Sequence, residues 1–244
     1  MSGVEILTSI KCKIADLVTE IPDVGGIAPR CKGYLSHEKG PTDIIIRADL
    51  FHPERFPWAS ENDMVYMETG IQFYSELLKY QGMMLHASAV ELDGKAYLFS
   101  GPCGTGKSTH TRLWKNTFGD AAQIFNDDKP ALRYVDNRWF SYGTPWCGKD
   151  GINQNKKVPL AGICFLKQAD VNNIRQLSNQ EAMNQVIYQT FRKFKTSEKL
   201  DLMLSQVDKL VREIPCFEME NRPEPDAVKL SYETMCNRAK EMGL

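Results

Sequence analysis

Hydrophobic residues recur every three or four positions in several long stretches of this chain. Between residues 61 and 82 they fall on one stripe, at Met64, Met67, Ile71, Tyr74 and Leu78. That spacing predicts a helix over 61–82 whose apolar face lies in the core. We expect further helices at 107–116, 179–194 and 198–212, and a last helix with Asp226 as its N-cap.

Short runs of β-branched and aromatic residues predict the strands. We expect them at 85–91, 95–100, 122–125, 131–135, 138–142, 158–166 and 214–219. The dipeptides Asp93-Gly94 and Asp136-Asn137 are turn signals for hairpins. Strands mixed with helices indicate an α/β (or α+β) fold, and the hairpins make its sheet mixed.

The first 60 residues have a different character. Runs at 12–21, 31–36 and 42–51 suggest strands, broken by prolines and glycines, and 52–60 reads as a loop. We therefore expect a small β-rich N-terminal region at 1–60 and a larger core at 61–244.

Composition and charge exclude several classes of protein. Hydrophobic residues are 42% and charged residues 25% of the 244, as in globular proteins. The 30 basic and 31 acidic residues leave a net charge of −1, so we expect neither nucleic acid nor a membrane surface as partner. No apolar run reaches the roughly 18 residues of a spanning helix, and no signal peptide is recognised. Seven cysteines without a CxxC pair suggest free thiols in the cytoplasm.

Residues 101–108 read GPCGTGKS, which is the phosphate-binding pattern G-x-x-x-x-G-K-[ST]. Glycines let the backbone curl so that several N–H groups converge on a phosphate chain. A strand directly before and a helix directly after are the context that this motif requires. We expect ATP to bind here with Mg²⁺, Lys107 to reach the β- and γ-phosphates, and Ser108 to supply a hydroxyl to the metal. The predicted nucleotide-binding residues are Gly101, Pro102, Cys103, Gly104, Thr105, Gly106, Lys107, Ser108 and Thr109.

A second group of candidates lies outside this loop. Asp127 and Asp128 follow a short apolar strand, where one carboxylate can hold Mg²⁺ and the other can accept a proton from an attacking hydroxyl. His86 begins the strand that pairs with the strand before the P-loop. In the polar loop 143–158, Lys149 is the candidate for contact with phosphate or acceptor, and Trp146 suggests packing or recognition.

Three side chains on the helix after the P-loop have simpler expectations. We place His110 and Arg112 on the surface, with Arg112 able to approach a phosphate, and Trp114 in the core.

The stretch HASAVELDGKAYLFSGPCGTGKSTHTRLWKNTFGDAAQIFNDD (86–128) resembles the catalytic core of the HPr kinase/phosphorylase family, whose fold is shared with phosphoenolpyruvate carboxykinase. YGTPWCGK (142–149) and VPLAGICFL (158–166) are similar to smaller HPr-kinase-like proteins. The resemblance implies a mixed-sheet P-loop core. It implies Asp127 as the base, Asp128 as the metal-side carboxylate, and His86 near the transferred phosphate or orienting Asp127. The two aspartates could exchange roles.

The leading expectation is an ATP-dependent kinase that phosphorylates a hydroxyl, on Ser or Thr of a peptide or small protein. One alternative is a small-molecule kinase for a sugar or amino acid. Another is a non-catalytic nucleotide-binding regulatory module. A peptide acceptor would need an open groove beside Asp127, and a small acceptor a closed pocket. A homo-oligomer is compatible with the sequence.

Overall fold

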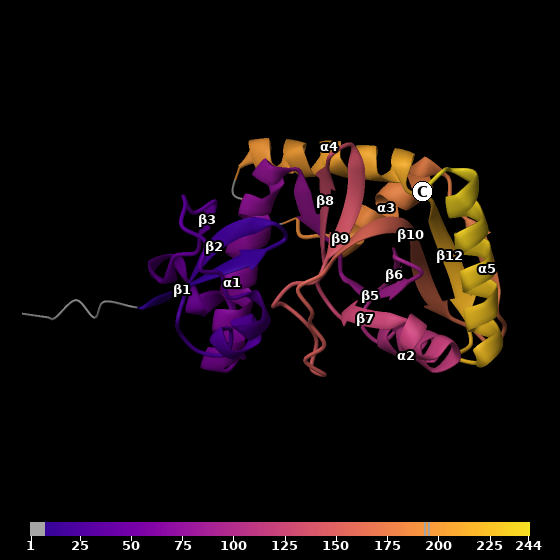
Figure 1. Ribbon diagram of the computed structural model, residues 1–244, viewed down its shortest axis with the longest axis horizontal. Coiled ribbons are helices and arrows are strands. Elements are labelled where there is room, and N and C mark those ends of the chain that lie inside the picture. Colours follow the sequence, from indigo (N-terminus) through magenta and orange to yellow (C-terminus); the bar gives the residue numbers. More distant parts are fainter. Residues whose placement is uncertain (1–7, 193, 195) are drawn as a thin grey trace, which may run out of the picture.

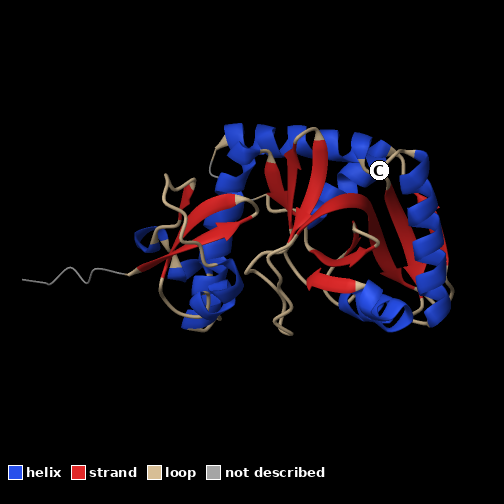
Figure 2. Cartoon of the chain, viewed as in Figure 1, coloured by secondary structure: helices blue, strands red, loops and turns tan. Residues whose placement is uncertain are grey.

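The computed structural model describes residues 8–192, 194 and 196–244. In this part of the chain, a small sheet lies at one end of the molecule, on the left of Figure 1, and a large mixed sheet flanked by helices makes up the rest (Figures 1 and 2). The mixed α/β class with a mixed sheet is therefore confirmed. The division at residue 60 stays a prediction.

The secondary structure elements have the following bounds. The small sheet contains β1 (Ser9–Ile14), β2 (Leu17–Pro22) and β3 (Ile44–Ile45). The large sheet contains β4 (Gly82–Met84), β5 (Ala87–Leu92), β6 (Lys95–Ser100), β7 (Gln123–Asn126), β8 (Ala131–Val135), β9 (Arg138–Tyr142), β10 (Lys157–Gln168), β11 (Asn173–Gln176) and β12 (Cys216–Asn221). The helices are α1 (Glu61–Leu77), α2 (Lys107–Phe118), α3 (Asn179–Gln189), α4 (Ser197–Glu213) and α5 (Pro225–Glu241). None of the helices in the described ranges is both long and apolar enough to cross a membrane.

The large sheet has the order β4-β8-β9-β10-β6-β5-β7, with β12 added on β10 and β11 on β12. Strand β10 changes partner along its length. Its first residues pair antiparallel with β9 (Val158 opposite Ser141), and its later ones pair parallel with β6 (Ile163 opposite Leu98) and β12. This exchange of partners joins the antiparallel half to the mixed half and makes the sheet curl.

The strand directions bring three chain segments to one edge of this sheet. β5 pairs antiparallel with both β6 and β7, so β6 and β7 run in the same direction. β10 and β12 run parallel to β6. The ends of β6 and β7 therefore lie at the edge where β5 begins, although the segments are distant in sequence.

Alternation along the strands gives the sheet two buried faces, because successive side chains point to opposite sides. In β6, Tyr97 and Phe99 belong to a cluster that includes Trp114 of α2 and side chains of α5. Leu98, between them, belongs to the cluster on the other face, with Val207 of α4. Helices α2 and α5 thus cover one face, and α3 and α4 cover the other.

The N-terminal segment differs from the expected β-rich layout. The run 12–21 is a hairpin rather than one strand, because Ala15 and Asp16 turn the chain with φ of 51° and 63°. Residues 31–36 fall mainly in a 3₁₀ helix, Ala28–Tyr34, and not in a strand. Within 42–51 only β3 is a strand, and Ala48–Leu50 is a 3₁₀ turn. These segments are too short for the hydrophobic spacing of a strand, every second residue, to be distinguished from that of a 3₁₀ helix, every third residue.

Other boundaries also move. The helix predicted over 61–82 ends at Leu77, and a 3₁₀ turn leads to Gln81, whose φ is 53°, before β4 begins. Helix α3 ends at Gln189 instead of residue 194. The N-cap of α5 is Glu224 and not Asp226. Pro225 is the first residue of the helix, and Asp226 is the second. Strands β4 and β11 were not predicted.

Candidate functional site

The P-loop joins β6 to α2 at the sheet edge described above. Gly101, Gly104 and Gly106 have φ of 145°, 84° and 92°, a region that only glycine adopts without strain. A Cβ on Gly101 would lie 2.8 Å from Oγ1 of Thr105. These glycines therefore fix the curl of the loop, as the motif predicts.

The start of α2 has no side-chain cap. Its N-cap residue is Gly106, and no side chain accepts a hydrogen bond there. Helices α1, α3 and α4 are capped by Ser60, Ser178 and Thr196, whereas α5, like α2, has no side-chain cap. The first N–H groups of a helix carry partial positive charge, so the uncapped start of α2 fits a phosphate group.

Lys107 lies against the loop with only 8% of its surface exposed. Its ammonium donates to the carbonyl oxygens of Gly101 (2.9 Å) and Pro102 (3.0 Å). Burial lowers the pKa of this ammonium, and Asp128 opposes that shift. The lysine side chain is thus held against the loop by the loop's own carbonyl oxygens.

The remaining predicted P-loop residues are accessible to different degrees. Pro102, Cys103, Gly104 and Thr109 are exposed. Thr105 and Ser108 are half-buried. A cavity of about 560 Å³ adjoins the loop and is also lined by Gln168, Tyr188 and Gln189. This cavity gives a ligand on the loop room to extend across the ends of β10 and α3.

The acid pair follows β7 in a turn held by Asn126, whose Oδ1 accepts from the backbone N–H groups of Asp128 (3.2 Å) and Lys129 (2.9 Å). Asp127 is 7% exposed, and its Oδ1 accepts from the N–H of Gly148 at 2.7 Å. Burial raises the pKa of Asp127, although the Gly148 bond opposes the shift. Asp127 is therefore bound to the loop 143–156.

Asp128 has a different environment from its neighbour. Its carboxylate is paired with the Lys129 ammonium and lies 3.4 Å from Nε2 of His86. The hydroxyl of Tyr66 is 3.4 Å away. Burial alone would lower the pKa of Lys129, but Asp128 and Tyr66 outweigh it, so the pKa is raised and the ammonium stays charged.

His86 links the acid pair to α3. Its Nδ1 is 3.1 Å from Oε1 of Gln189, and its backbone N–H donates to the Gln189 carbonyl at 2.9 Å. Burial lowers the pKa of His86, and the nearby Lys107 ammonium lowers it further. We therefore expect a neutral imidazole at pH 7, with its Nδ1 beside Gln189 and its Nε2 facing Asp128.

The structure brings together the P-loop, His86, Asp127 and Asp128, but Lys149 stands apart. It is exposed, and it forms no hydrogen bond or ion pair with any residue in the described ranges. Trp146 in the same loop is fully buried and stacked on Phe73 at 4.7 Å, so its role is packing. Arg112 is half-exposed and paired with Asp150, as expected of a surface residue.

His110 is a wrong prediction. It is completely buried, with Nδ1 3.0 Å from Oδ1 of Asn221 and Nε2 3.1 Å from Oγ of Ser231. Trp114 is buried in the core, as predicted. The seven cysteines are free, and Cys103 is the exposed one.

The sequence missed three residues of the site. Lys129 could have been noticed as the cation directly after the acid pair. Tyr66 comes from α1 and accepts from the Lys129 ammonium at 3.0 Å, while donating to the carbonyl of Cys147 at the same distance. Gln189 comes from the end of α3. Neither Tyr66 nor Gln189 carries a local signal.

The oxygen atoms of the side chains at this site could hold Mg²⁺ only together with phosphate oxygens. No group of three or more His, Cys, Asp or Glu side chains that could hold a metal occurs among the described residues. Mg²⁺ in nucleotide sites is bound by one or two protein oxygens, phosphate oxygens and water. Ser108 and Asp128 remain the predicted metal ligands, and both belong to segments that meet at this edge of the sheet.

Comparisons with known proteins give a family and distant similarities to solved structures. The HPr(Ser) kinase/phosphatase from Coxiella burnetii is similar with a TM-score of 0.37 and 12% identity, over 66% of this chain and 92% of that one. No curated protein matches the chain. The model of the family described as SynChlorMet cassette protein ScmC matches residues 59–222, which include the P-loop and the acid pair. Because this match spans about two thirds of its residues, the chain belongs to the ScmC family.

Proposed function

We propose that this protein is an ATP-dependent kinase that transfers the γ-phosphoryl group to a hydroxyl of Ser or Thr on a peptide or small protein. One observation carries the proposal: the P-loop with Lys107, the acid pair and His86 come from separate segments and meet at one sheet edge. The Asp128 carboxylate opposes the lowering of the Lys107 pKa, and Lys107 and Asp128 both act on the pKa of His86.

The donor side would be formed by the P-loop and Asp128. The uncapped N–H groups of α2 and the Lys107 ammonium would bind the β- and γ-phosphates. Ser108 and Asp128 would hold Mg²⁺, which neutralises charge on the phosphate oxygens. The Lys129 ammonium is paired with the Asp128 carboxylate and so fixes its orientation.

The acceptor side would be formed by Asp127. The acceptor oxygen attacks the γ-phosphorus, the bond to the β-phosphate oxygen breaks, the hydroxyl proton passes to the Asp127 carboxylate, and ADP leaves. A raised pKa makes this carboxylate a better proton acceptor than an exposed aspartate. His86 is a positioning residue for Asp128, because its ring contacts that carboxylate and not Asp127.

The surroundings of Asp127 favour a peptide acceptor over a small molecule. The loop bound to Asp127 through Gly148 is exposed at Lys149, Asp150 and Gly151. A peptide can bind along such an exposed loop and place one hydroxyl at Asp127, whereas a sugar or amino acid needs enclosure. Lys149 would then meet the acceptor chain.

The test follows the label from γ-³²P-ATP and Mg²⁺ in a desalted lysate of the source cell, with and without its small-molecule fraction. Wild type is compared with the Lys107→Ala variant and with an EDTA control. The proposal predicts a discrete labelled peptide or protein that both controls lack. A labelled metabolite would favour the small-molecule kinase. ATP binding without any transfer would favour the regulatory module.

A further inference from the structure

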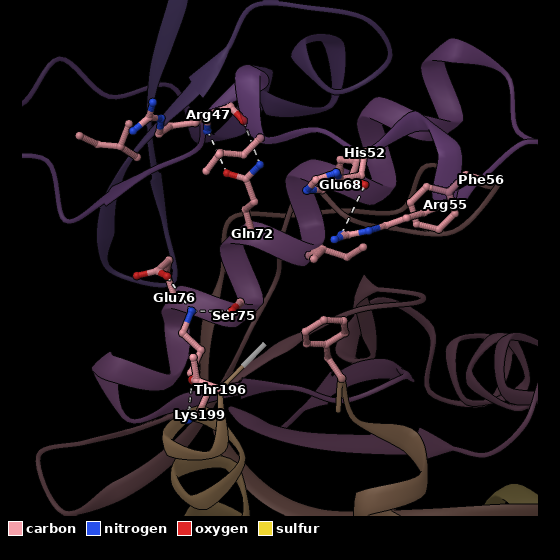
Figure 3. A pocket seen from close by; sticks show the side chains of 14 residues that line it. Arg47, His52, Arg55, Phe56, Glu68, Gln72, Ser75, Glu76, Thr196 and Lys199 are labelled. Carbon is pink, nitrogen blue, oxygen red and sulfur yellow. Dashed lines mark hydrogen bonds and ion pairs between the residues drawn. The ribbon is translucent and has the colours of Figure 1, made fainter. Parts of the chain in front are cut away.

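A cavity on the other side of α1 is separate from the phosphate site. It has a volume of about 920 Å³ and is lined by the 3₁₀ turns before α1, by α1 itself, and by Phe191, Thr196 and Lys199 (Figure 3). Its volume is in the range of pockets for small organic ligands. Tyr66 of α1 contacts Asp128, whereas Glu68, two positions on and so on the opposite side of the helix, lines the cavity.

Glu68 is the unusual residue of this cavity. Only 1% of its side chain is exposed, and its Oε1 has no hydrogen-bond partner. Among the described residues the nearest cation is Arg55, whose Nη1 is 3.8 Å from this oxygen, beyond hydrogen-bond distance (Figure 3). A buried carboxylate without hydrogen bonds is costly, so it favours a ligand that donates them.

The other charged groups around the cavity already have partners. Arg47 is bound to Asp49 at 2.7 Å, and the Lys199 ammonium is bound to Glu76 at 2.8 Å and Ser75. They therefore offer little spare positive charge to an anion. Arg55 is more than a third exposed, so water solvates it, whereas Glu68 is not solvated. Among the described charged groups that line the cavity, Glu68 is the one whose buried oxygen lacks a hydrogen-bond donor, and a cation would supply one.

Apolar side chains supply the rest of the lining. Ile45 and Leu50 are 58% and 47% exposed at its rim, and Phe56, Ile71 and Phe191 also line it. Exposed apolar groups beside a cavity are typical of ligand sites.

We propose that this cavity binds a ligand with an apolar body and a primary ammonium or guanidinium group, which displaces Arg55 and donates hydrogen bonds to Glu68. Both a free amine and a Lys or Arg side chain of a peptide have this chemistry. The site goes beyond phosphoryl transfer and needs no nucleotide.

The test uses dansylcadaverine, an aromatic body on an alkylammonium stem, whose fluorescence rises in an apolar pocket. Its N-acetyl derivative has the same body without charge, and dansyl-aminohexanoate carries a negative charge instead. We expect the cationic probe to bind the full chain about tenfold more tightly than the neutral one. Equal binding of the two, or preference for the anionic probe, would overturn the proposal.

Variants locate the charge preference. Glu68→Gln is expected to remove the preference for the cationic over the neutral probe. Glu54→Gln, which changes an exposed acid next to Arg55, should keep this preference. Arg55→Ala is expected to tighten the cationic probe, because it removes the group that the ligand displaces. Thermal unfolding of each variant confirms the fold. A preference that survives in Glu68→Gln, or weaker cation binding in Arg55→Ala, would contradict the assignment.

Competition then separates the two sources of the cation. Tyramine represents the free amine, and acetyl-Leu-Lys-Phe-amide represents the peptide side chain. Stronger displacement by tyramine identifies a small-molecule site, and stronger displacement by the peptide identifies a peptide-recognition site. Failure of both to displace the probe would overturn the proposal.

Discussion

At the residue scale, Asp127 and Asp128 are adjacent but have opposite surroundings. Asp127 is buried, accepts from the backbone of Gly148, and has a raised pKa. Asp128 is surrounded by the Lys129 ammonium, the His86 ring and the Tyr66 hydroxyl. In pairs of acids the environment separates the roles, with the more basic carboxylate suited to accept a proton. This division supports Asp127 as the base and Asp128 as the metal-side ligand.

The pH dependence of transfer follows from the raised pKa of Asp127. The base acts only when ionised, so kcat/KM should fall as pH decreases through that pKa. Because burial raises the pKa, the fall should begin at a higher pH than for an exposed aspartate. Rates with Mg²⁺ in excess measure this, and the pH dependence of ATP binding alone serves as the control. A rate that stays level down to the ordinary pKa of aspartate would contradict the assignment.

The sequence predicted the residues of this site whose signals are local. The P-loop, the acid pair and His86 each stand in a short pattern around a strand end. Tyr66 lies in a helical stretch whose neighbours Met64 and Met67 predict only packing, and its contact with Lys129 depends on how α1 docks. His110 was expected on the surface because its partners, Asn221 and Ser231, are more than 100 residues away.

At the element scale, the loop 143–156 connects the Asp127 carboxylate to strand β9. It leaves β9 at Gly143, whose N–H donates to the carbonyl of Lys156 at 3.0 Å, and it brings Gly148 to Asp127. A Cβ on Gly143 would lie 1.8 Å from the carbonyl oxygen of Gln154. The close approach of these two backbones therefore requires glycine.

We expect Gly143→Ala to lower the free energy of unfolding by about 2 kcal/mol, because the loop must move away from β9. Transfer should fall as well, since the loop carries Gly148 to Asp127. Urea unfolding and the transfer rate measure the two effects. Gly40→Ala is the matched control, because a Cβ there meets nothing within 4 Å. Equal stability of the two variants would show that the loop does not depend on this contact.

The buried histidine of α2 predicts a second effect on stability. Burial lowers the pKa of His110 to about 4, from its ordinary value of 6.5. Above pH 6.5 the histidine is neutral in both folded and unfolded states. Between pH 6.5 and 4 only the unfolded state takes up the proton, so stability decreases as pH falls, by up to about 3 kcal/mol.

Urea unfolding of wild type and His110→Gln between pH 7 and 4 tests this effect. The carboxylates titrate in both proteins, so the difference between the two curves isolates His110. We expect a flatter curve for the variant. Parallel curves would contradict the lowered pKa.

Some elements were predictable because their turn chemistry is local. Asp93 and Gly94, with φ of 53° and 73°, form the turn between β5 and β6, and Asp136 and Asn137 do the same between β8 and β9. The 3₁₀ helix at Ala28–Tyr34 could not be predicted in this way. Its buried residues, Cys31 and Tyr34, gain their environment from the N-terminal sheet and α1.

At the scale of the whole molecule, the N-terminal region and the larger part share buried surface. Ile14 and Ile21 of the small sheet belong to one hydrophobic cluster with Phe73 of α1. The same cluster contains Tyr142 of β9 and Trp146 of the loop that follows it. Burial of this kind couples the parts, because neither could keep its apolar residues from water alone. The two parts should therefore unfold together.

We expect tryptophan fluorescence and far-UV circular dichroism to give the same unfolding midpoint in urea. Ile14→Ala should lower both midpoints together, with a loss of about 2–5 kcal/mol, because Ile14 is completely buried. Two separate midpoints would show that the parts are independent.

The most direct test of phosphoryl transfer compares Asp127→Asn with Asp120→Asn, a change of an exposed aspartate near the end of α2. The amide can still accept from Gly148, so we expect the fold and ATP binding to be preserved. Transfer of label from γ-³²P-ATP should fall by about 10²-fold or more in Asp127→Asn and remain unchanged in Asp120→Asn. Transfer by Asp127→Asn at the wild-type rate, with ATP bound equally well, would contradict the proposed role of this carboxylate.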